Sequence, residues 1–387
     1  MTDRLRVAVL FGGRSVEHEI SVISALQLMM AIDPAKYEAL PVYISPSGTW
    51  HTGEALLDRS FYSRVPSSLG GLVEVTLLPK PGVGGLTKVA GGGVIPVDVF
   101  LPAFHGQYGE DGCIQGLFEM AEVPYTGSNV PASAVTMNKY LCKMFLAAHG
   151  IPVLPAAVVE RGDAQRNIQG VVASIAADPR FGAYPLFVKP CNLGSSIGVS
   201  RVEVPGDLAA ALAKVFRYDT QALVEPCVSQ LMEINVSVRD CNGAAPSVVE
   251  IPVSQSGVLS YEEKYMRDGG KKSGQSQGMA SLTRIIDPPD LAAEIRDAVT
   301  SYATRSFRLL GCSGVARLDF IYDLAASAVY FNELNAFPGS CSFYLWAKSR
   351  PRVLYTELID GMIQAALRSY SVVSSLERDI GLRALRT

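Results

Sequence analysis

The sequence predicts an α/β protein that begins with a parallel sheet and continues in an α+β arrangement. Strand-like and helix-like segments alternate through the first third of the chain, and this alternation is typical of parallel sheets covered by helices. Further on, two strand-like runs, Val315–Tyr322 and Ala328–Leu334, follow each other with only a short turn between them, as adjacent strands of one sheet do. A length of 387 residues allows two or three domains.

The first third has three apolar strand-like segments separated by helical or irregular ones. The segments Gly12–Glu19 and His105–Gln115 follow the first and third of them. Ligands bind beyond the carboxyl ends of parallel strands, so we expect both segments to border a site. Residues 52–94 are rich in Gly and Pro and predict short strands and loops. The predicted main strands are Arg6–Phe11, Tyr37–Ile44 and Val97–Ala103.

The middle of the chain is predicted to mix helices with short strands. One helix over Ser133–His149 ends at Gly150 and Pro152, both of which interrupt helices. The elements expected after it are a strand at Ala156–Glu160, a helix over 163–177, a hairpin around Lys189, a helix over Gly206–Phe216 and a strand at Gln221–Val224.

The last third starts with a strand at Met232–Asp240 and continues into a long polar segment, Ser254–Arg284, which is rich in Gly, Ser and Lys. A loop of that length in a compact protein is commonly a functional lid or a disordered segment. The helix predicted over Pro289–Leu310 has apolar residues spaced by three and four. An amphipathic helix at Val353–Leu367 is expected to close the fold.

Composition excludes several classes of protein. The net charge is only −3, and lysines and arginines form no basic run, so we expect no nucleic-acid partner. No apolar run is long enough to cross a membrane, and no signal peptide is evident. Seven scattered cysteines without a C-x-x-C pair indicate reduced thiols and predict a cytoplasmic protein.

Four polar side chains on the two adjacent strands predict a metal site. Arg317 and Asp319 share one face of the first strand, and Glu333 and Asn335 end the second strand in the same alternation. An oxygen-only set without His or Cys suits Mg²⁺ or Mn²⁺ rather than zinc. Taken alone, the pattern also fits two ordinary strands with solvated polar residues.

The segment Pro185–Val202 adds a candidate phosphate-binding hairpin. An apolar strand delivers Lys189 directly before a turn that contains Gly194, Ser195 and Ser196. Glycine lets backbone amides approach an anion, and lysine adds a point charge for phosphate. The order of residues differs from a Walker A loop, and a simple hairpin turn is the alternative.

Seven segments in register resemble the D-alanine–D-alanine ligase family of the ATP-grasp superfamily. They are VAVLFGGRSVEHEISV, PAFHGQYGEDGCIQGLFE, MNKYLCKMFLAAHGIPV, FVKPCNLGSSIGVS, YEEKY, LGCSGVARLDF and NELNAFPG, and the match spans roughly residues 5–370. The resemblance implies a three-domain ATP-grasp architecture. Its parts would be an N-terminal α/β domain at 1–130 for the first substrate, a central subdomain at 131–230, and a C-terminal subdomain at 231–387 with the metal site and a lid at 254–284.

The resemblance also implies a reaction in which ATP activates one D-alanine as an acyl phosphate, which the amine of a second D-alanine then attacks. Carboxylate and triphosphate repel each other, so cations must neutralise the site, and the acyl phosphate must be shielded from water. Two Mg²⁺ ions, or Mn²⁺, would be held by Asp319, Glu333 and Asn335. ATP would be contacted by Lys139, Lys189, Glu225, Glu233 and Lys264.

The same resemblance gives the remaining site residues their roles. Arg317 and the backbone amide of Gly339 would stabilise the tetrahedral intermediate. The first D-alanine and the lid would be positioned by Glu17, His105, Ser195 and Tyr265. The family further implies a homodimer.

One position departs from the family pattern on the side of the second substrate. A serine that helps to bind its carboxylate is expected five residues after Gly339, but Tyr344 stands there, and Ser342 is the nearest substitute. We expect the Tyr344 side chain to point away from the site and D-alanine to remain the second substrate. The alternatives are a related ligase that uses D-serine, D-lactate or another amino acid as acceptor, and a nucleotide-binding regulator without activity.

Overall fold

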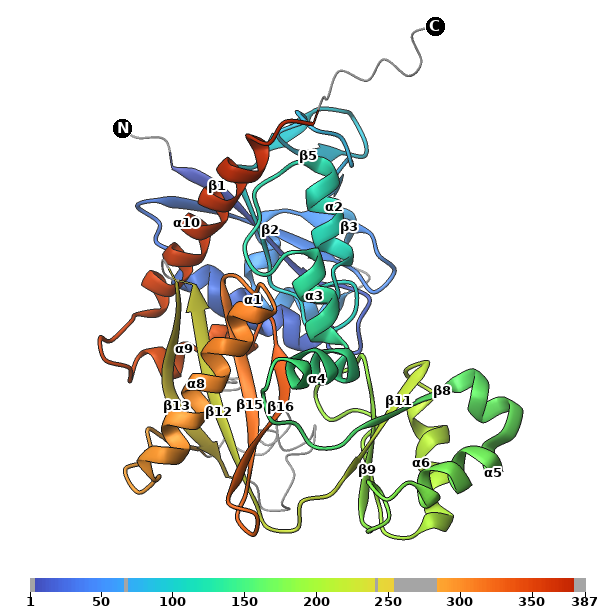
Figure 1. The fold of residues 1–387 in the computed structure, drawn as a ribbon. Helices are drawn as coiled ribbons and strands as arrows, with labels where there is room; N and C mark the ends of the chain where they lie inside the picture. Colours follow the sequence, from blue (N-terminus) through green and yellow to red (C-terminus); the bar gives the residue numbers. More distant parts are fainter. Residues whose placement is uncertain (1–3, 66–68, 241–242, 254–283, 379–387) are drawn as a thin grey trace, which may run out of the picture.

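The structure is a computed structural model that describes residues 4–65, 69–240, 243–253 and 284–378. Three sheets form its framework (Figure 1). The predicted lid at 254–284, with Lys264 and Tyr265, lies outside the described residues except for Arg284. No helix among the described residues is long and apolar enough to span a membrane.

The N-terminal sheet is parallel only in part. Its seven strands have the order β6-β5-β4-β3-β2-β1-β7, and β1 pairs in parallel with β2 and with β7. The pairs from β2 to β6 are antiparallel, and β3 to β6 are short strands in the Gly- and Pro-rich stretch, where tight turns join them. The strands are β1 (Leu5–Gly12), β2 (Tyr37–Ile44), β3 (Trp50–Thr52), β4 (Val73–Thr76), β5 (Gly85–Lys88), β6 (Val94–Pro96) and β7 (Val99–Pro102).

Helices cover both faces of this sheet. Successive side chains of β1 point to opposite faces, so each face has apolar residues that pack against a helix. Val7, Val9 and Phe11 pack with residues of α1 (His18–Ala31) and of α10 (Tyr355–Ser374). Ala8 and Leu10 instead join the apolar cluster of α2 (Cys113–Ala121). The parallel strands are therefore buried on both sides, and their carboxyl ends open onto the rest of the molecule.

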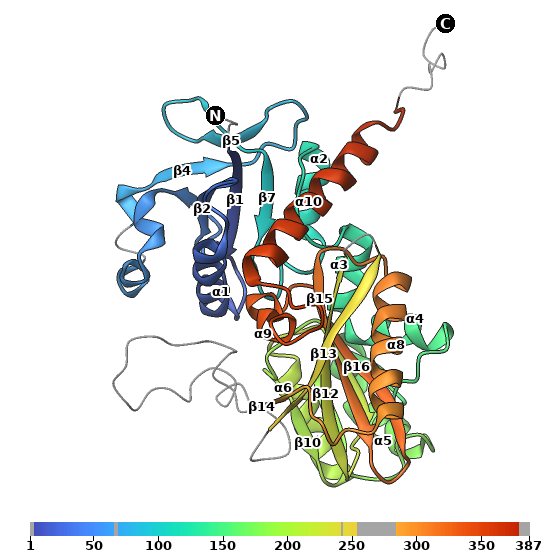
Figure 2. The same ribbon diagram turned by 90° about the vertical axis from the view of Figure 1, so that its left-hand side faces the viewer.

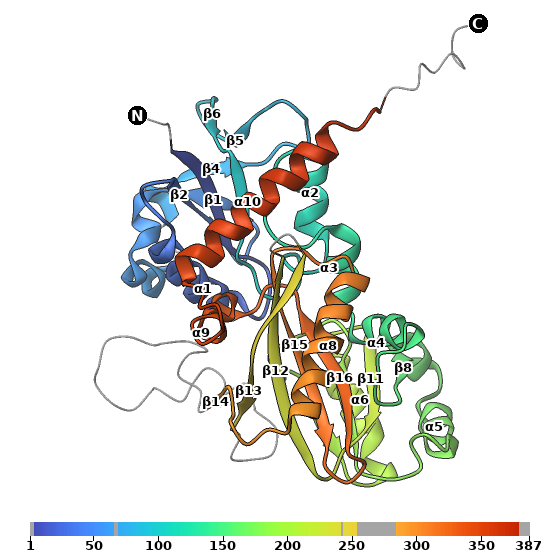
Figure 3. The ribbon, with the colours of Figure 1, turned by 60° about the vertical axis from the view of Figure 1, so that its left-hand side comes forward.

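The helix α10 returns from the C-terminal end of the chain to the N-terminal domain. It runs beside β1 and β7 in Figure 3, and the Tyr37 hydroxyl donates to Asp360 on it at 2.6 Å. It extends to Ser374, beyond the predicted end at Leu367. The remaining short elements are η1 (Glu54–Leu57), η2 (Arg59–Arg64), η3 (Leu69–Gly71), η4 (Pro205–Asp207), η6 (Gly339–Ser342) and α9 (Phe343–Trp346).

The central sheet is antiparallel, with the strand order β10-β9-β11-β8. Helices α5 (Arg161–Ala177) and α6 (Leu208–Val215) pack against it in one apolar cluster, close to where the sequence places them. The strands are β8 (Ala157–Glu160), β9 (Leu186–Pro190), β10 (Ser200–Val202) and β11 (Gln221–Pro226).

The C-terminal sheet is also antiparallel and has the order β14-β13-β12-β15-β16. Helix α8 (Ala293–Leu309) packs against it in a large apolar cluster (Figure 2). The strands are β12 (Leu231–Asp240), β13 (Ala244–Pro252), β14 (Arg284–Ile286), β15 (Val315–Asp323) and β16 (Ala328–Asn335).

The single helix predicted over Ser133–His149 is two helices, α3 (Val130–Met137) and α4 (Lys139–Ala148). Asn138 separates them, because its backbone is extended and its side chain caps α4 by accepting from the Leu141 amide at 2.9 Å. The break turns α4 so that Cys142 and Leu146 pack with the C-terminal sheet. The same helix contributes to a small cluster with β11, so it lies between the two antiparallel sheets.

Candidate active site

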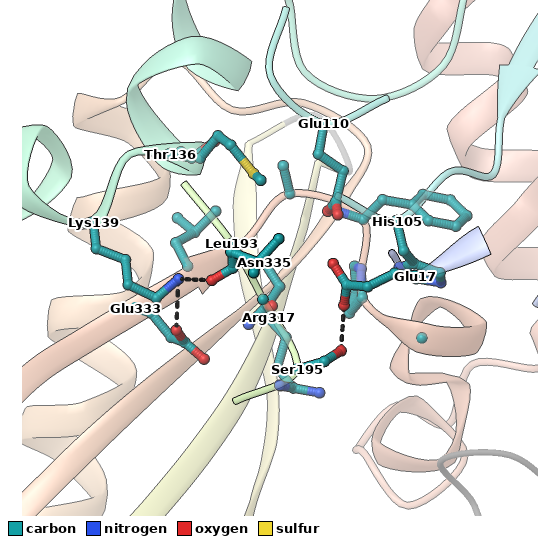
Figure 4. A pocket seen from close by; sticks show the side chains of 17 residues that line it. Glu17, His105, Glu110, Thr136, Lys139, Leu193, Ser195, Arg317, Glu333 and Asn335 are labelled. Atoms are coloured by element: carbon teal, nitrogen blue, oxygen red, sulfur yellow. Dashed lines mark hydrogen bonds and ion pairs between the residues drawn. The ribbon is translucent and has the colours of Figure 1, made fainter. Parts of the chain in front are cut away.

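Two adjoining cavities lie where the three sheets meet. The first is lined by residues that follow β1 and β7, by Arg317 and by the loop from Asn335 to Gly339 (Figure 4). The second lies between the two antiparallel sheets and is lined by Lys189, Glu233 and Asp319 among others. The residues common to both walls are Lys139, Leu193, Gly194, Arg317 and Glu333.

The four polar residues predicted on the two strands do lie together. Arg317 stands opposite Asn335, and Asp319 stands opposite Glu333, in the ladder between β15 and β16. Arg317 donates to both carboxylate oxygens of Asp319, at 2.7 and 2.8 Å. The Asn335 amide also donates to Asp319, at 3.3 Å. Two carboxylates and an amide therefore face the cavities as one cluster, and this oxygen set fits a hard divalent cation.

Two cations of the protein neutralise these acids. Although burial opposes its charge, the Asp319 carboxylate holds the pKa of Arg317 above its ordinary value. The Lys139 ammonium lies 3.4 Å from a Glu333 oxygen and donates to the Leu193 carbonyl at 2.6 Å (Figure 4). Lys139 is thus fixed at the boundary of the two cavities, where an anionic group could reach it.

The turn after β9 has an unusual backbone conformation. Ser195 and Ser196 both have a positive φ, 54° and 57°, which ordinary side chains rarely adopt. The Ser195 hydroxyl donates to Glu17, which precedes α1 and is almost fully buried. A methyl group on Gly194 would lie 3.0 Å from a Glu17 oxygen, so a larger residue there would require the Glu17 carboxylate to shift. The first cavity thereby joins the N-terminal domain to the central one.

His105 and Glu110 complete the wall of the first cavity. His105 accepts or donates a hydrogen bond at 2.9 Å with Ser24, and burial, helped by the Arg317 charge, lowers the pKa of His105 to about 4. The Glu110 carboxylate accepts from the amides of Gly106 at 2.7 Å and Phe337 at 3.1 Å. Burial, reinforced by Glu17, raises the pKa of Glu110 to about 8. The motif analysis did not single out Glu110, although it lies within the quoted segment after His105.

Glu225 does not line either cavity, contrary to its expected position at the edge of a nucleotide base. It lies on β11 with 3% of its side chain exposed and forms ion pairs with Lys143 and with Lys189, the latter at 2.6 Å. Lys143 was not predicted, although it follows Lys139 by one helical turn and so shares its face of α4. Burial lowers the pKa of Lys143, and the Glu225 carboxylate opposes this shift.

Tyr344 lines neither cavity but contacts two residues in the wall of the second cavity, and the expectation that it points away from the site stays a prediction. Its hydroxyl donates to Glu250 at 3.0 Å, and the Arg284 guanidinium lies 4.1 Å from the centre of its ring. Arg284 also pairs with Glu250 at 3.0 Å, and both of them line the second cavity. Sequence reasoning missed Arg284 and Glu250, because only the pairing of β13 with β14 brings them beside α9.

Ser342, the predicted substitute for the missing serine, lies away from both cavities. Its side chain is fully buried, and its hydroxyl has no hydrogen-bond partner within the described residues. Three successive residues, Ser340, Cys341 and Ser342, have left-handed φ values of 49°, 53° and 48°. Gly339, directly before them, does line the first cavity, as its predicted role requires.

Comparisons with known proteins agree with this arrangement. Sequence profiles described as the N-terminus and the C-terminus of D-Ala–D-Ala ligase match residues 6–128 and 145–364. D-alanine–D-alanine ligase A of Bradyrhizobium diazoefficiens is 37% identical over 386 residues, which cover 98% of this chain and 99% of the relative. The ligase of Geobacillus kaustophilus is 35% identical over 374 residues, covering 95% and 96% of the two chains.

Solved structures with similar folds include ligases with two different acceptors. The D-alanine–D-alanine ligase of Coxiella burnetii has a TM-score of 0.77 and 28% identity, with 96% of this chain and 97% of that chain covered. A D-Ala:D-Ser ligase of Enterococcus faecalis has a TM-score of 0.75 and 27% identity, with 94% and 100% covered.

Proposed function

The chain belongs to the D-alanine–D-alanine ligase family, and from this premise we propose that it joins two D-alanines into D-alanyl-D-alanine while ATP is hydrolysed to ADP. The dipeptide would serve as a precursor of peptidoglycan. The observation that carries the proposal is the shared wall of the two cavities, where Lys139, Arg317 and Glu333 border both. A phosphoryl group can pass from a nucleotide to a carboxylate only where the two are held in contact.

The first cavity suits the amino-acid substrates. Glu17 gives it a carboxylate that would attract an ammonium group, while Arg317 lies in the same wall. The first D-alanine would place its ammonium near Glu17 and its carboxylate toward Arg317 and Lys139. The Arg317 guanidinium and the Gly339 amide would then stabilise negative charge on the carbonyl oxygen as the second amine attacks. His105 would position this substrate as a neutral ring.

The second cavity suits the nucleotide. Lys139 and Lys189 would contact the phosphates, and Glu233 at its rim would accept from the ribose hydroxyls. Asp319, Glu333 and Asn335 would hold two Mg²⁺ ions, with Mn²⁺ as a substitute. When bound, these ions neutralise the charge of the phosphates. Lys264 and Tyr265 keep their predicted roles in ATP binding and in covering the site.

A ligase with D-serine as its acceptor is the second candidate function. The observation that favours it is Tyr344, whose hydroxyl and ring hold Glu250 and Arg284 at the wall of the second cavity. A D-Ala:D-Ser ligase is also among the similar structures. An inactive regulator is disfavoured, because the acids and cations that phosphoryl transfer requires lie together in the structure.

The proposal is tested by incubating the chain with ATP, Mg²⁺ and D-alanine. We expect ADP release that depends on D-alanine and a product with the mass of D-alanyl-D-alanine. Release of ADP at the same rate without D-alanine would contradict the proposal. The same preparation should require a divalent cation and elute as a homodimer, and the reduced thiols predicted by the scattered cysteines support a cytoplasmic location.

A further inference from the structure

Two lysines share one buried carboxylate behind the wall of the second cavity. Lys143 on α4 pairs with one oxygen of Glu225, and Lys189 on β9 lies 2.6 Å from the other. The carboxylate is held on β11, next to β9 in the central sheet. Lys143 reaches the same carboxylate from helix α4. The cluster of Lys143, Glu225 and Lys189 thus ties α4 to the central sheet.

The two lysines differ in their access to the cavity. Lys189 has 13% of its side chain exposed, lines the second cavity and also donates to Asn332 at 3.2 Å. The side chain of Lys143 is fully buried and lines neither cavity, and Glu225 also lies behind the wall. Only Lys189 can therefore exchange its present partner for a ligand, whereas Lys143 and Glu225 stay in place.

The charges of the cluster do not balance. Two ammonium groups and one carboxylate leave one positive charge, and it is closest to the cavity at Lys189. If Lys189 turned toward an anion in the cavity, Glu225 and Lys143 would remain as a neutral buried pair. Without Lys143, the same movement would leave a buried carboxylate without a cation, which is strongly unfavourable. Lys189 would then be held by Glu225.

A merely structural ion pair needs only one lysine. Glu225 and Lys189 alone would make a neutral pair, and a second buried ammonium adds the cost of removing another charge from water. An apolar side chain in place of Lys143 would fill the same space between α4 and β11 without that cost. The second lysine is therefore better explained by what it allows Lys189 to do.

We propose that Lys143 is a positioning residue for the nucleotide: it neutralises Glu225 so that Lys189 can turn from Glu225 to the phosphates of the bound nucleotide. The inference rests on the proposed function in that it takes the second cavity as the nucleotide site. It adds Lys143 as a residue that does not contact the ligand and yet controls how strongly the phosphates are bound. The contacts between the protein and the nucleoside part of the nucleotide do not depend on Lys143.

The test compares two ligands that differ in their phosphates. Binding of a non-hydrolysable ATP analogue with Mg²⁺ and binding of adenosine are measured by calorimetry for the wild type and for Lys143→Met. We expect the affinity for the analogue to fall roughly tenfold or more, because Lys189 stays on Glu225, and the affinity for adenosine to stay within about twofold. Lys36→Met is the matched control, since this exposed lysine pairs with Asp360 at 3.2 Å and lines neither cavity, and it should change neither affinity.

A second variant separates positioning from a general loss of structure. In the Glu225→Gln background there is no carboxylate to hold Lys189, so adding Lys143→Met should leave the analogue affinity unchanged. Glu225→Gln alone should raise the affinity for the analogue relative to that for adenosine, which keeps the proposal testable if Lys143→Met does not fold. Equal weakening of both ligands by Lys143→Met, or a loss that persists beside Glu225→Gln, would overturn the proposal. Failure of the proposed function would instead appear as absence of dipeptide product in the wild type.

Discussion

The nucleotide side and the amino-acid side of the site hold their acids in different ways. Around the second cavity, Asp319, Glu333 and Glu225 are each paired with a lysine or an arginine of the protein. Around the first cavity, Glu17 accepts from a serine hydroxyl and Glu110 accepts from two backbone amides. Cations on one side could contact phosphates, and the Glu17 carboxylate on the other side could contact an ammonium group. The difference suits the anionic phosphates of one ligand and the ammonium group of the other.

The largest effect is expected on the nucleotide side. Glu333→Gln should lower kcat by roughly a hundredfold or more, because it removes charge that helps to hold the cations of phosphoryl transfer. The fold should persist, since Glu333 is partly exposed and its ion pair with Lys139 is 3.4 Å long. Steady-state kinetics and thermal melting measure both effects. Asp323→Asn, the same charge change at the end of the neighbouring strand β15, should keep normal turnover, and a normal rate for folded Glu333→Gln would remove the metal assignment.

The next effect concerns stability on the amino-acid side. The pKa of Glu110 is about 8 in the folded protein and near 4.5 when unfolded, so the folded state binds the proton more strongly. The stability that Glu110 contributes is present below pH 4.5 and is lost as the pH rises to about 8. Glu110→Gln mimics the protonated acid and should become more stable relative to the wild type across this window, by a few kcal/mol at most. Urea unfolding at several pH values measures the difference, and a difference that does not change with pH would argue against the raised pKa.

A smaller effect is expected where the chain departs from its family. Tyr344→Phe keeps the ring beside Arg284 but removes the hydrogen bond to Glu250, worth about 1.5–3 kcal/mol for a charged acceptor. We expect a Michaelis constant for the second D-alanine that is several-fold higher and an unchanged one for ATP. If the Michaelis constant for ATP rises instead, the cluster of Tyr344, Glu250 and Arg284 belongs to the nucleotide side of the site and not to the acceptor side.

The smallest effect is expected at Ser342. Its left-handed backbone and its buried hydroxyl without a hydrogen-bond partner among the described residues both cost free energy. Ser342→Gly should therefore raise the free energy of unfolding by about 1 kcal/mol without changing the Michaelis constant for the second D-alanine. Unfolding by urea and steady-state kinetics test the two statements separately. A raised Michaelis constant would return Ser342 to the acceptor site as first predicted.

The nucleotide side could be predicted largely from the sequence. Asp319 and Glu333 lie on two strands that are joined by a short turn. The antiparallel pairing that such a turn imposes places them opposite each other. The break at Asn138 was also readable in principle, because asparagine is a preferred N-cap. It was missed since the apolar spacing continues across it. The pairing of Lys143 with Glu225 depends on the packing of α4 against β11, which local patterns do not contain.

The acceptor side could not be predicted in the same way. The direction of Tyr344 follows from the turn over Ser340, Cys341 and Ser342, whose three left-handed residues include neither Gly nor Asn. No local signal therefore indicated that turn. Its partners Glu250 and Arg284 come from strands that precede and follow the segment 254–283, far from it in the sequence.

Product identity under competition tests the central claim most directly. The chain is incubated with ATP, Mg²⁺ and equal concentrations of D-alanine, D-serine and D-lactate at neutral pH, and the products are separated and identified by mass spectrometry. We predict D-alanyl-D-alanine as the main product, because the chain belongs to the D-alanine–D-alanine ligase family. A main product of D-alanyl-D-serine or D-alanyl-D-lactate, or no ligated product at all, would contradict this account.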